Sequence, residues 1–230
     1  MGKLKAVLFD LYGTLAYVKD PISSEKISEF LLEQGYKVYP QSIDAASHFV
    51  GMIDYPKHGY DSWKTYLKQV LYRLDTEADT KTLDELAKIY IKHRSLTLFS
   101  DAAPAVRKTK ELGLKTAIVT TIARFSFSQA IESIQEYFDV ITTGYEAKCE
   151  KSNPDMHKQT LKKLCVLPQE AVMIGDELLV DVKVPRKLGM HTIQLDRSRK
   201  ARKASEAYAI ARTLTEAVDR IEKWRNHRVS

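Results

Sequence analysis

A carboxylate stands at the end of the first apolar run of this chain. Residues Lys5–Phe9 form a short strand-like run, Asp10 follows it directly, and Gly13 lies in the turn beyond. In an open α/β sheet, ligands bind at the carboxyl ends of the strands, so Asp10 would face a binding crevice. Taken alone, the same aspartate could equally cap a turn. A binding role for Asp10 can therefore be inferred only together with the residues at other strand ends.

Polar side chains recur at later strand ends. They are Thr120 and Thr121 after one apolar run, Lys151 just ahead of a predicted helix, and Asp176 and Asp181 after another run. Threonine hydroxyls and nearby N–H groups can hold the oxygens of an anion, and carboxylates bind hard cations. Each residue alone is ordinary, since a single lysine is usually solvated and a single threonine usually bonds to backbone. Their order, each at a strand end, indicates one site.

The elements that must position these side chains alternate between strand and helix. Five short apolar runs read as buried strands: Lys5–Phe9, Lys115–Thr120, Asp139–Thr142, Ala171–Gly175 and His191–Leu195, with Tyr208–Ile210 as a possible sixth. Helix-length stretches lie between the later runs: Pro104–Leu112, Ser126–Ile134, Asp155–Leu164 and Val182–Leu188. This alternation predicts an α/β fold with a parallel, Rossmann-like sheet covered on both faces.

The stretch between Leu15 and Ser100 has a different pattern. Strand-like runs are missing there, and apolar residues recur at helical spacing over Ser24–Gln34, Ser62–Leu74 and Thr82–Arg94. These stripes are typical of a helical core. We therefore predict a sheet domain of residues 1–15 and 100–230, with a separate helical unit of residues 16–99 inserted after the first strand.

Composition places the chain among globular proteins without a membrane span. Of the 230 residues, 44% are apolar and 29% are charged, and no apolar run approaches the roughly 20 residues that cross a bilayer. The N-terminal stretch is unlike a signal peptide, and the two cysteines, Cys149 and Cys165, have no zinc-type spacing. We expect a cytoplasmic protein.

The net charge of +6 suggests an anionic partner. A basic run near the C-terminus comprises Arg197, Arg199, Lys200, Arg202 and Lys203, but it contains no aromatic residues for base stacking and belongs to no recognisable nucleic-acid motif. A solvated basic loop is therefore favoured over nucleic-acid binding, and a small anionic substrate also suits the charge.

Taken in order, these residues resemble the four motifs of the haloacid dehalogenase superfamily. Asp10, Thr120, Lys151 and the Asp176/Asp181 pair stand in the motif positions, and this family places its cap domain where the helical unit is inserted. The chain departs from the usual pattern in two places. Ser-Asn-Pro follows Lys151, and Pro185 falls inside a predicted helix; because proline is tolerated only in a first turn, that helix should begin near Val184.

The resemblance implies a covalent reaction supported by a metal ion. Asp10 would be the nucleophile, and Mg²⁺ would be held by Asp10, the backbone carbonyl of Tyr12 and Asp176, with Asp181 either a ligand or an outer partner. Lys151 would add positive charge. Thr120 would hold substrate oxygens together with neighbouring amides, and the substrate-binding set would also include Tyr12, Thr121 and Lys151.

Members of this family catalyse different reactions. Its phosphatases usually carry a second aspartate two residues after the nucleophile, where this chain has Tyr12, as in the 2-haloacid dehalogenase branch. That branch, however, uses an arginine early in the cap and lacks metal-site aspartates, whereas the first arginine here is Arg73 and Asp176 and Asp181 are kept. We therefore favour a phosphatase acting on a small phosphorylated metabolite. A 2-haloacid dehalogenase is the alternative, followed by a non-catalytic anion-binding member of the fold.

The substrate and the oligomeric state stay open at this point. Polar or aromatic residues of the cap that could line the substrate site are Tyr17, Lys19, Tyr55, Lys57 and His58.

Overall fold

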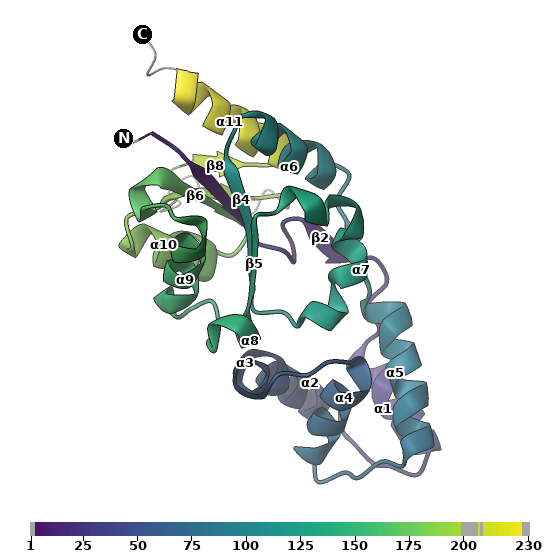
Figure 1. The fold of residues 1–230 in the computed structure, drawn as a ribbon. Coiled ribbons are helices and arrows are strands. Elements are labelled where there is room, and N and C mark those ends of the chain that lie inside the picture. Colours follow the sequence, from purple (N-terminus) through teal and green to yellow (C-terminus); the bar gives the residue numbers. More distant parts are fainter. Residues whose placement is uncertain (1–2, 199–206, 208, 227–230) are drawn as a thin grey trace.

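A six-stranded parallel sheet forms the centre of the computed structural model, which describes residues 3–198, 207 and 209–226 (Figure 1). The strand order is β5-β4-β1-β6-β7-β8, and every neighbouring pair is parallel. The bounds are β1 Ala6–Phe9, β4 Lys115–Thr120, β5 Val140–Thr143, β6 Ala171–Gly175, β7 His191–Leu195 and β8 Ala209–Ala211. The predicted α/β class and parallel sheet are confirmed.

Helices cover both faces of this sheet, which explains why its strands are apolar on both sides. Helices α6 (Ala102–Glu111) and α11 (Leu214–Asn226) pack on one face, and α9 (Pro154–Leu164) packs on the other (Figure 1). Alternate residues of β1 enter the two cores, so Val7 and Phe9 pack with α6 and α11, whereas Ala6 and Leu8 face α9. Strand β1, which ends just before Asp10, is therefore packed against helices on both faces of the sheet.

The inserted unit is a helical cap with its own core. Its helices are α1 Ser24–Glu33, α2 Pro40–Phe49, α3 Tyr55–His58, α4 Trp63–Tyr72 and α5 Thr80–Arg94, with a π-helical segment, Val50–Asp54, between α2 and α3. Ile27, Leu31, Leu67 and Leu86 are buried together at its centre. The stripes that predicted α1, α4 and α5 are the residues that form this core.

The expectation that no strand lies between Leu15 and Ser100 is wrong. Strands β2 (Ala16–Val18) and β3 (Leu96–Leu98) pair antiparallel where the chain enters and leaves the cap. Each has only three residues, too few to display the alternation that identifies a strand. The rings of Tyr17 and Phe99 stack beside this pair with centroids 4.6 Å apart. The two connections to the cap are thus bound to each other.

Most predicted helices of the sheet domain are present, with one irregular exception. The α-helix α10 (Val184–Lys187) does begin at Val184, with Pro185 in its first turn, but a π-helical segment, Leu178–Lys183, precedes it. The helix predicted over Ser126–Ile134 is instead divided into the short helix α7 (Ser128–Ile131) and two 3₁₀ turns. The stretch 40–58 was not predicted to be helical, although it forms α2, the π-helical segment and α3.

The expectations about membrane spans, cysteines and the basic run concern the chain as a whole. No helix among the described residues combines the length and the apolar composition that crossing a bilayer requires, and both cysteines are free thiols. Of the basic run, Arg197 is described, and its guanidinium binds the Asp101 carboxylate at 2.9 and 3.1 Å and the Thr14 carbonyl at 2.8 Å. The other four basic residues lie outside the described residues.

Candidate active site

The sheet brings the predicted motif residues together because β1 lies between β4 and β6. Phe9 is in register with Ile118 on one side and with Ile174 on the other, so the chain segments that follow these three strands leave the sheet side by side. The Asp10 N–H still donates to the Ile174 carbonyl at 2.9 Å. This extra bond fixes the backbone of Asp10 at the sheet edge, so its side chain emerges between Thr120 and Asp176.

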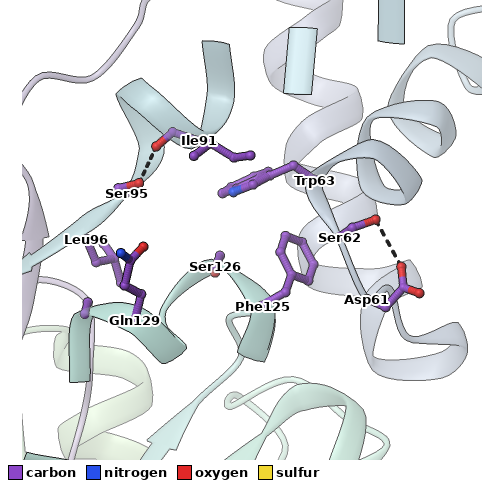
Figure 2. Close-up of a pocket in the computed structure, with 10 residues that line it drawn as sticks. Asp61, Ser62, Trp63, Ile91, Ser95, Leu96, Phe125, Ser126 and Gln129 are labelled. Atoms are coloured by element: carbon purple, nitrogen blue, oxygen red, sulfur yellow. Dashed lines mark hydrogen bonds between the residues drawn. The ribbon is translucent and has the colours of Figure 1, made fainter. Parts of the chain in front are cut away.

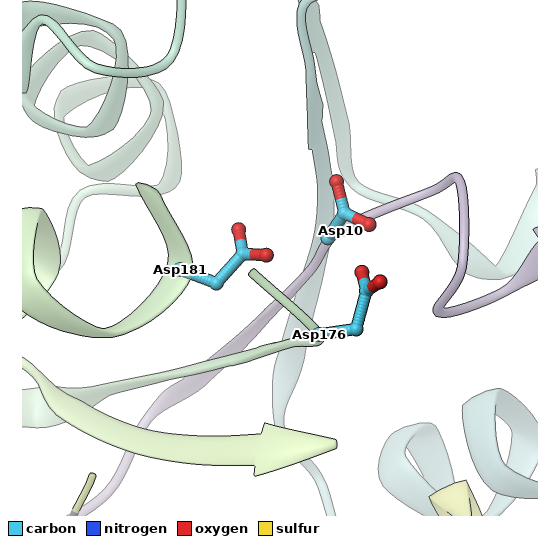
Figure 3. A group of neighbouring side chains, drawn as sticks. All are labelled: Asp10, Asp176 and Asp181. Carbon is cyan, nitrogen blue, oxygen red and sulfur yellow. The ribbon is translucent and has the colours of Figure 1, made fainter. Parts of the chain in front are cut away.

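Three carboxylates converge at this edge (Figure 3). Asp10, Asp176 and Asp181 each offer an oxygen that lies within 4.8 Å of the others, and Asp10 and Asp181 are buried. The Lys151 ammonium forms an ion pair with Asp10 Oδ1 and a second one, of 2.8 Å, with Asp181 Oδ1. Three carboxylates thus face one buried ammonium, which leaves an excess of negative charge if all three are ionised.

Two glycines make room for this cluster. A Cβ atom on Gly13, whose φ is +82°, would lie 2.4 Å from Asp176 Oδ2, and a Cβ on Gly175 would lie 2.2 Å from the Asp181 side chain. Both distances are far shorter than any real contact, and the positive φ of Gly13 independently favours glycine. The glycines that flank Asp10 and Asp176 in the sequence therefore permit the close approach of the carboxylates.

The donor set fits a hard divalent cation. Asp10 Oδ2 is buried and has no hydrogen-bond partner among the described residues, and Asp176 accepts one hydrogen bond, from the Thr14 hydroxyl at 3.3 Å. Asp181 Oδ2 accepts from the Glu177 N–H at 3.0 Å, whereas Asp181 Oδ1 lies 2.8 Å from the Lys151 ammonium but, like Asp10 Oδ2, has no hydrogen-bond partner among the described residues. A buried, unpartnered carboxylate oxygen is costly without a counter-charge, and oxygen ligands are what Mg²⁺ and Ca²⁺ prefer.

Burial and mutual repulsion shift the protonation of these groups. Burial, reinforced by the Asp10 carboxylate, raises the pKa of Asp176 to about 6. Burial also raises the pKa of Asp181 to about 7, although the Lys151 ammonium opposes the shift. Burial disfavours the charge of Lys151, but Asp10 and Asp181 outweigh it and hold the pKa of Lys151 above its ordinary value. Without a cation, the folded cluster therefore takes up protons near neutral pH.

This proton uptake predicts the pH dependence of stability. An aspartate in the unfolded chain has a pKa near 3.9, so between about pH 4 and 7 the folded protein binds protons that the unfolded chain has released. The free energy of unfolding should therefore fall as pH rises through this window, by on the order of a few kcal/mol from Asp181. Saturating Mg²⁺ should reverse the loss at pH 7.5. Thermal unfolding from pH 5 to 8, in chelator and in Mg²⁺, measures both effects.

An Asp181→Asn variant is the control for this prediction. It keeps an oxygen for the Glu177 N–H but cannot titrate, so its stability in chelator should depend less steeply on pH than that of wild type. Equal slopes in the two proteins would show that another group controls the pH dependence.

The two predicted threonines have distinct positions. The Thr120 hydroxyl is buried and accepts from the Ile122 N–H at 3.2 Å, which leaves its own hydrogen available to a ligand. The Thr121 hydroxyl accepts from the Lys151 N–H at 3.1 Å and so ties the loop after β4 to the segment that carries Lys151. Thr120 can thus donate to an anion, while Thr121 fixes the backbone of Lys151.

A pocket of about 270 Å³ lies above Asp10, and the cap forms part of its wall. Its lining comprises Asp10, Tyr12, His48, Met52, Thr120, Thr121, Ile122, Glu150, Lys151, Ser152, Glu177 and Val180. Sequence reasoning missed the two cap residues, His48 and Met52, which come from the unpredicted α2 and π-helical segment. The cap residues suggested instead, Tyr17, Lys19, Tyr55, Lys57 and His58, do not line this pocket.

The fold and this site can now be compared with known proteins. Residues 4–189 match the family of haloacid dehalogenase-like hydrolases. The chain belongs to this family. The resemblance carried by Asp10, Thr120, Lys151 and Asp176 is therefore confirmed at the level of the family.

Relatives within the family include enzymes of both kinds. A glyceraldehyde 3-phosphate phosphatase of Methanopyrus kandleri is 24% identical over 203 residues, 85% of each chain. The crystal structure of a HAD phosphatase from Thermococcus onnurineus is 26% identical with a TM-score of 0.62, covering 95% of this chain and 98% of that one. A 2-haloacid dehalogenase from Pseudomonas syringae pv. Tomato DC3000 has a TM-score of 0.70 at 17% identity, covering 96% and 99%. The last likeness establishes the fold alone.

Proposed function

We propose that this hydrolase is a Mg²⁺-dependent phosphatase that acts on a small phosphorylated substrate through Asp10. The observation that carries the proposal is the cluster of three carboxylates around Lys151, with Asp10 Oδ2 buried and unpartnered among the described residues. Asp10, Asp176 and the Tyr12 carbonyl would hold the ion. Asp181, which is ion-paired with Lys151 and accepts from the Glu177 N–H, would instead position Lys151.

The side chains divide the chemistry among them. One Asp10 oxygen attacks phosphorus, the new O–P bond forms as the bond to the leaving oxygen breaks, and water then releases phosphate from the aspartyl phosphate. The Lys151 ammonium and the Thr120 hydroxyl would stabilise the phosphoryl oxygens as charge moves onto them. When bound, Mg²⁺ would offset the negative charge of the carboxylates and that of the substrate.

A 2-haloacid dehalogenase is the second candidate, and Tyr12 favours it. A halide needs no proton when it leaves carbon, so a tyrosine in place of the second aspartate would cost such an enzyme nothing. Against this stands the pocket, whose described lining includes no arginine that could draw off a halide. A dehalogenase would also hold three close carboxylates without a metal ion, and the raised pKa values of Asp176 and Asp181 show that burial already disfavours their charge. We therefore place phosphate ester hydrolysis first.

The two reactions are separated by a parallel assay of phosphate release and halide release. We expect phosphate release from aryl or acyl phosphates in Mg²⁺, a fall of at least 10²-fold in excess chelator, and recovery when Mg²⁺ is restored. Asp176→Asn should raise the Mg²⁺ concentration required for half-maximal activity. Halide release from a 2-haloacid at full rate in chelator would establish the dehalogenase instead. Binding of a polyanion without turnover of either substrate would favour the non-catalytic reading.

The remaining expectations on partners follow from the same pocket. A volume of about 270 Å³ suits a small anion and not a nucleic-acid strand. We propose that the substrate is a small phosphorylated metabolite of the cytoplasm.

A further inference from the structure

An apolar cavity adjoins the pocket that contains Asp10. It has a volume of about 160 Å³ and lies between the cap and the loop that follows β4. Met52 and Ile122 line both spaces, so the two spaces are direct neighbours. We call this cavity the annex; its other lining residues are Ser47, Gly51, Tyr55, Trp63, Tyr66, Ala123, Phe125 and Ser126.

The annex has no charged lining. Among its described residues there is no aspartate, glutamate, lysine, arginine or histidine. Both of its phenols have partners within the protein: the Tyr66 hydroxyl donates to the Ser47 carbonyl at 2.8 Å, and the Tyr55 hydroxyl accepts from the Arg124 N–H at 3.4 Å. The Ser47 hydroxyl is buried without a hydrogen-bond partner among the described residues, so the lining includes one small, neutral polar group that is unpaired. Burial raises the pKa of Tyr66 and so keeps its phenol neutral. A charged group placed in the annex would lose its hydration without gaining a counter-charge.

The Asp10 pocket also discriminates against charge on the leaving group. Lys151, its buried cation, is committed to Asp10 and Asp181. Glu150 and Glu177 line the same pocket and would repel a second negative charge on the substrate. The buried ammonium of Lys151 lies beside Asp10, where the phosphoryl group would be held.

The size and the walls of the annex suit one ring. A cavity of roughly 150 Å³ lined by apolar side chains is known to take up benzene. Here Trp63 of the cap and Phe125 of the β4 loop meet edge to face, with centroids 5.2 Å apart. Figure 2 shows these two side chains next to each other on a larger cavity of about 700 Å³, which they line as well. The two rings therefore offer the annex an aromatic surface.

Gly51 keeps the annex open. It belongs to the π-helical segment Val50–Asp54, a rare geometry that recurs at functional sites, and glycine is unfavourable within a helix. A Cβ built on Gly51 would meet only the Tyr66 hydroxyl, at 3.8 Å, which is an ordinary contact. The backbone thus tolerates a side chain at this position, and a long one would occupy the annex.

We propose that the annex receives the leaving group of the substrate, and that this group is uncharged, apolar and about the size of one aromatic ring. The inference rests on the phosphatase function proposed above, since it takes the phosphoryl group to lie at Asp10. It names the substrate class as phosphate monoesters of ring-sized, neutral alcohols or phenols.

The test compares 2-phenylethyl phosphate with ethyl phosphate, because both release primary alcohols of similar acidity and differ in the ring. Wild type in saturating Mg²⁺ should favour the phenylethyl ester by about tenfold or more in kcat/KM. Glycerol 3-phosphate, whose leaving group is polar, should be no better than ethyl phosphate. Equal kcat/KM for the phenylethyl and ethyl esters would overturn the proposal.

Two substitutions at one position connect this preference to the annex. Gly51→Leu fills the cavity and should reduce the preference to less than about threefold while ethyl phosphate turnover stays within about twofold of wild type. Gly51→Ala, the matched control, should keep the preference. Full retention of the preference in Gly51→Leu would place the ring elsewhere and overturn the proposal.

A third substitution changes a residue of the sheet domain that lines the annex, so that the test does not depend on whether Gly51→Leu disturbs the cap. Phe125→Ala removes the wall shared with the larger cavity and should also lower the preference, by about fivefold. Tyr72→Ala removes an exposed aromatic residue of α4 and should change nothing. An unchanged preference in Phe125→Ala counts against the proposal, whereas absence of phosphate release in wild type from phenyl phosphate as well as from these alkyl esters would overturn the phosphatase function itself.

Discussion

Replacing Asp10 with asparagine should abolish turnover and leave the fold intact. The amide of asparagine cannot form the aspartyl phosphate, and loss of a nucleophile typically costs several powers of ten in kcat. Folding should not suffer, because Lys151 keeps its ion pair with Asp181. The change also removes the negative charge that helps to raise the pKa of Asp176, so stability in chelator should equal or exceed that of wild type.

The measurement is kcat for an aryl phosphate, with thermal unfolding of the same samples. Asp155→Asn is the matched control, because Asp155 is an exposed aspartate that is ion-paired with Lys158 at the protein surface, and it should retain full activity. Acid quenching of wild type during turnover of a radiolabelled substrate should leave label on the peptide that contains Asp10. If Asp10→Asn keeps more than about a tenth of wild-type kcat, another group is the nucleophile.

The sheet could be predicted because its strands are buried on both faces. Such strands appear as short continuous apolar runs, and β1, β4, β6 and β7 were each located to within a residue or two. Strands β2 and β3 were missed, since three half-exposed residues such as Leu96–Leu98 carry no periodic signal. They form only because the two connections to the cap lie next to each other, which depends on the whole fold.

The helices of the cap also differed in whether they could be predicted from the sequence. Helices α4 and α5 pack one stripe against the cap core, so their spacing was evident. The stretch 40–58 instead divides its contacts between the cap and the sheet domain: Val50 faces the cap interior, whereas Met52 faces the Asp10 pocket. A segment that serves two surfaces and contains π-helical turns has no single stripe to recognise.

The site was predictable as far as it is built from strand ends. Parallel strands place their carboxyl ends at one edge, so Asp10, Thr120 and Asp176 could be predicted to share that edge, and they are neighbours because β1 lies between β4 and β6. The partners of Asp181 could not be predicted, because the contacts with Lys151 and Glu177 depend on the π-helical segment Leu178–Lys183. His48 and Met52 line the pocket because the cap packs against the sheet domain. No local sequence pattern predicts how the two units pack.

Tyr12 offers the second large effect, because it stands where phosphatases of this family carry a second carboxylate. Its side chain is 51% exposed and lines the Asp10 pocket, so a shorter residue can be placed there without disturbing a core. A phenol is a poor proton donor and base near neutral pH compared with a carboxyl group tuned by its site. In the wild-type protein, the leaving group should therefore depart largely without a proton.

Tyr12→Asp should accordingly raise alkyl-phosphate turnover and barely change aryl-phosphate turnover. A positioned general acid contributes about 10²-fold or more, but an aryl leaving group is already stable as an anion and gains little from it. Tyr12→Asn is the matched control, since it has the same size and cannot transfer the proton. The measurement is kcat/KM for ethyl phosphate and phenyl phosphate in all three proteins.

The ratio of kcat/KM for ethyl phosphate to kcat/KM for phenyl phosphate in wild type shows whether another group supplies the proton. If wild type hydrolyses ethyl phosphate as fast as phenyl phosphate, another group supplies the proton. His48 is then the residue to replace, since it lines the Asp10 pocket from the cap and histidine is the side chain most often used in general acid–base catalysis; His48→Gln should lower only the alkyl rate. If none of the three proteins releases phosphate while wild type releases halide from a 2-haloacid, Tyr12 marks a dehalogenase. The carboxylate cluster would then have to work without a metal ion, and Asp176→Asn should leave the halide rate unchanged.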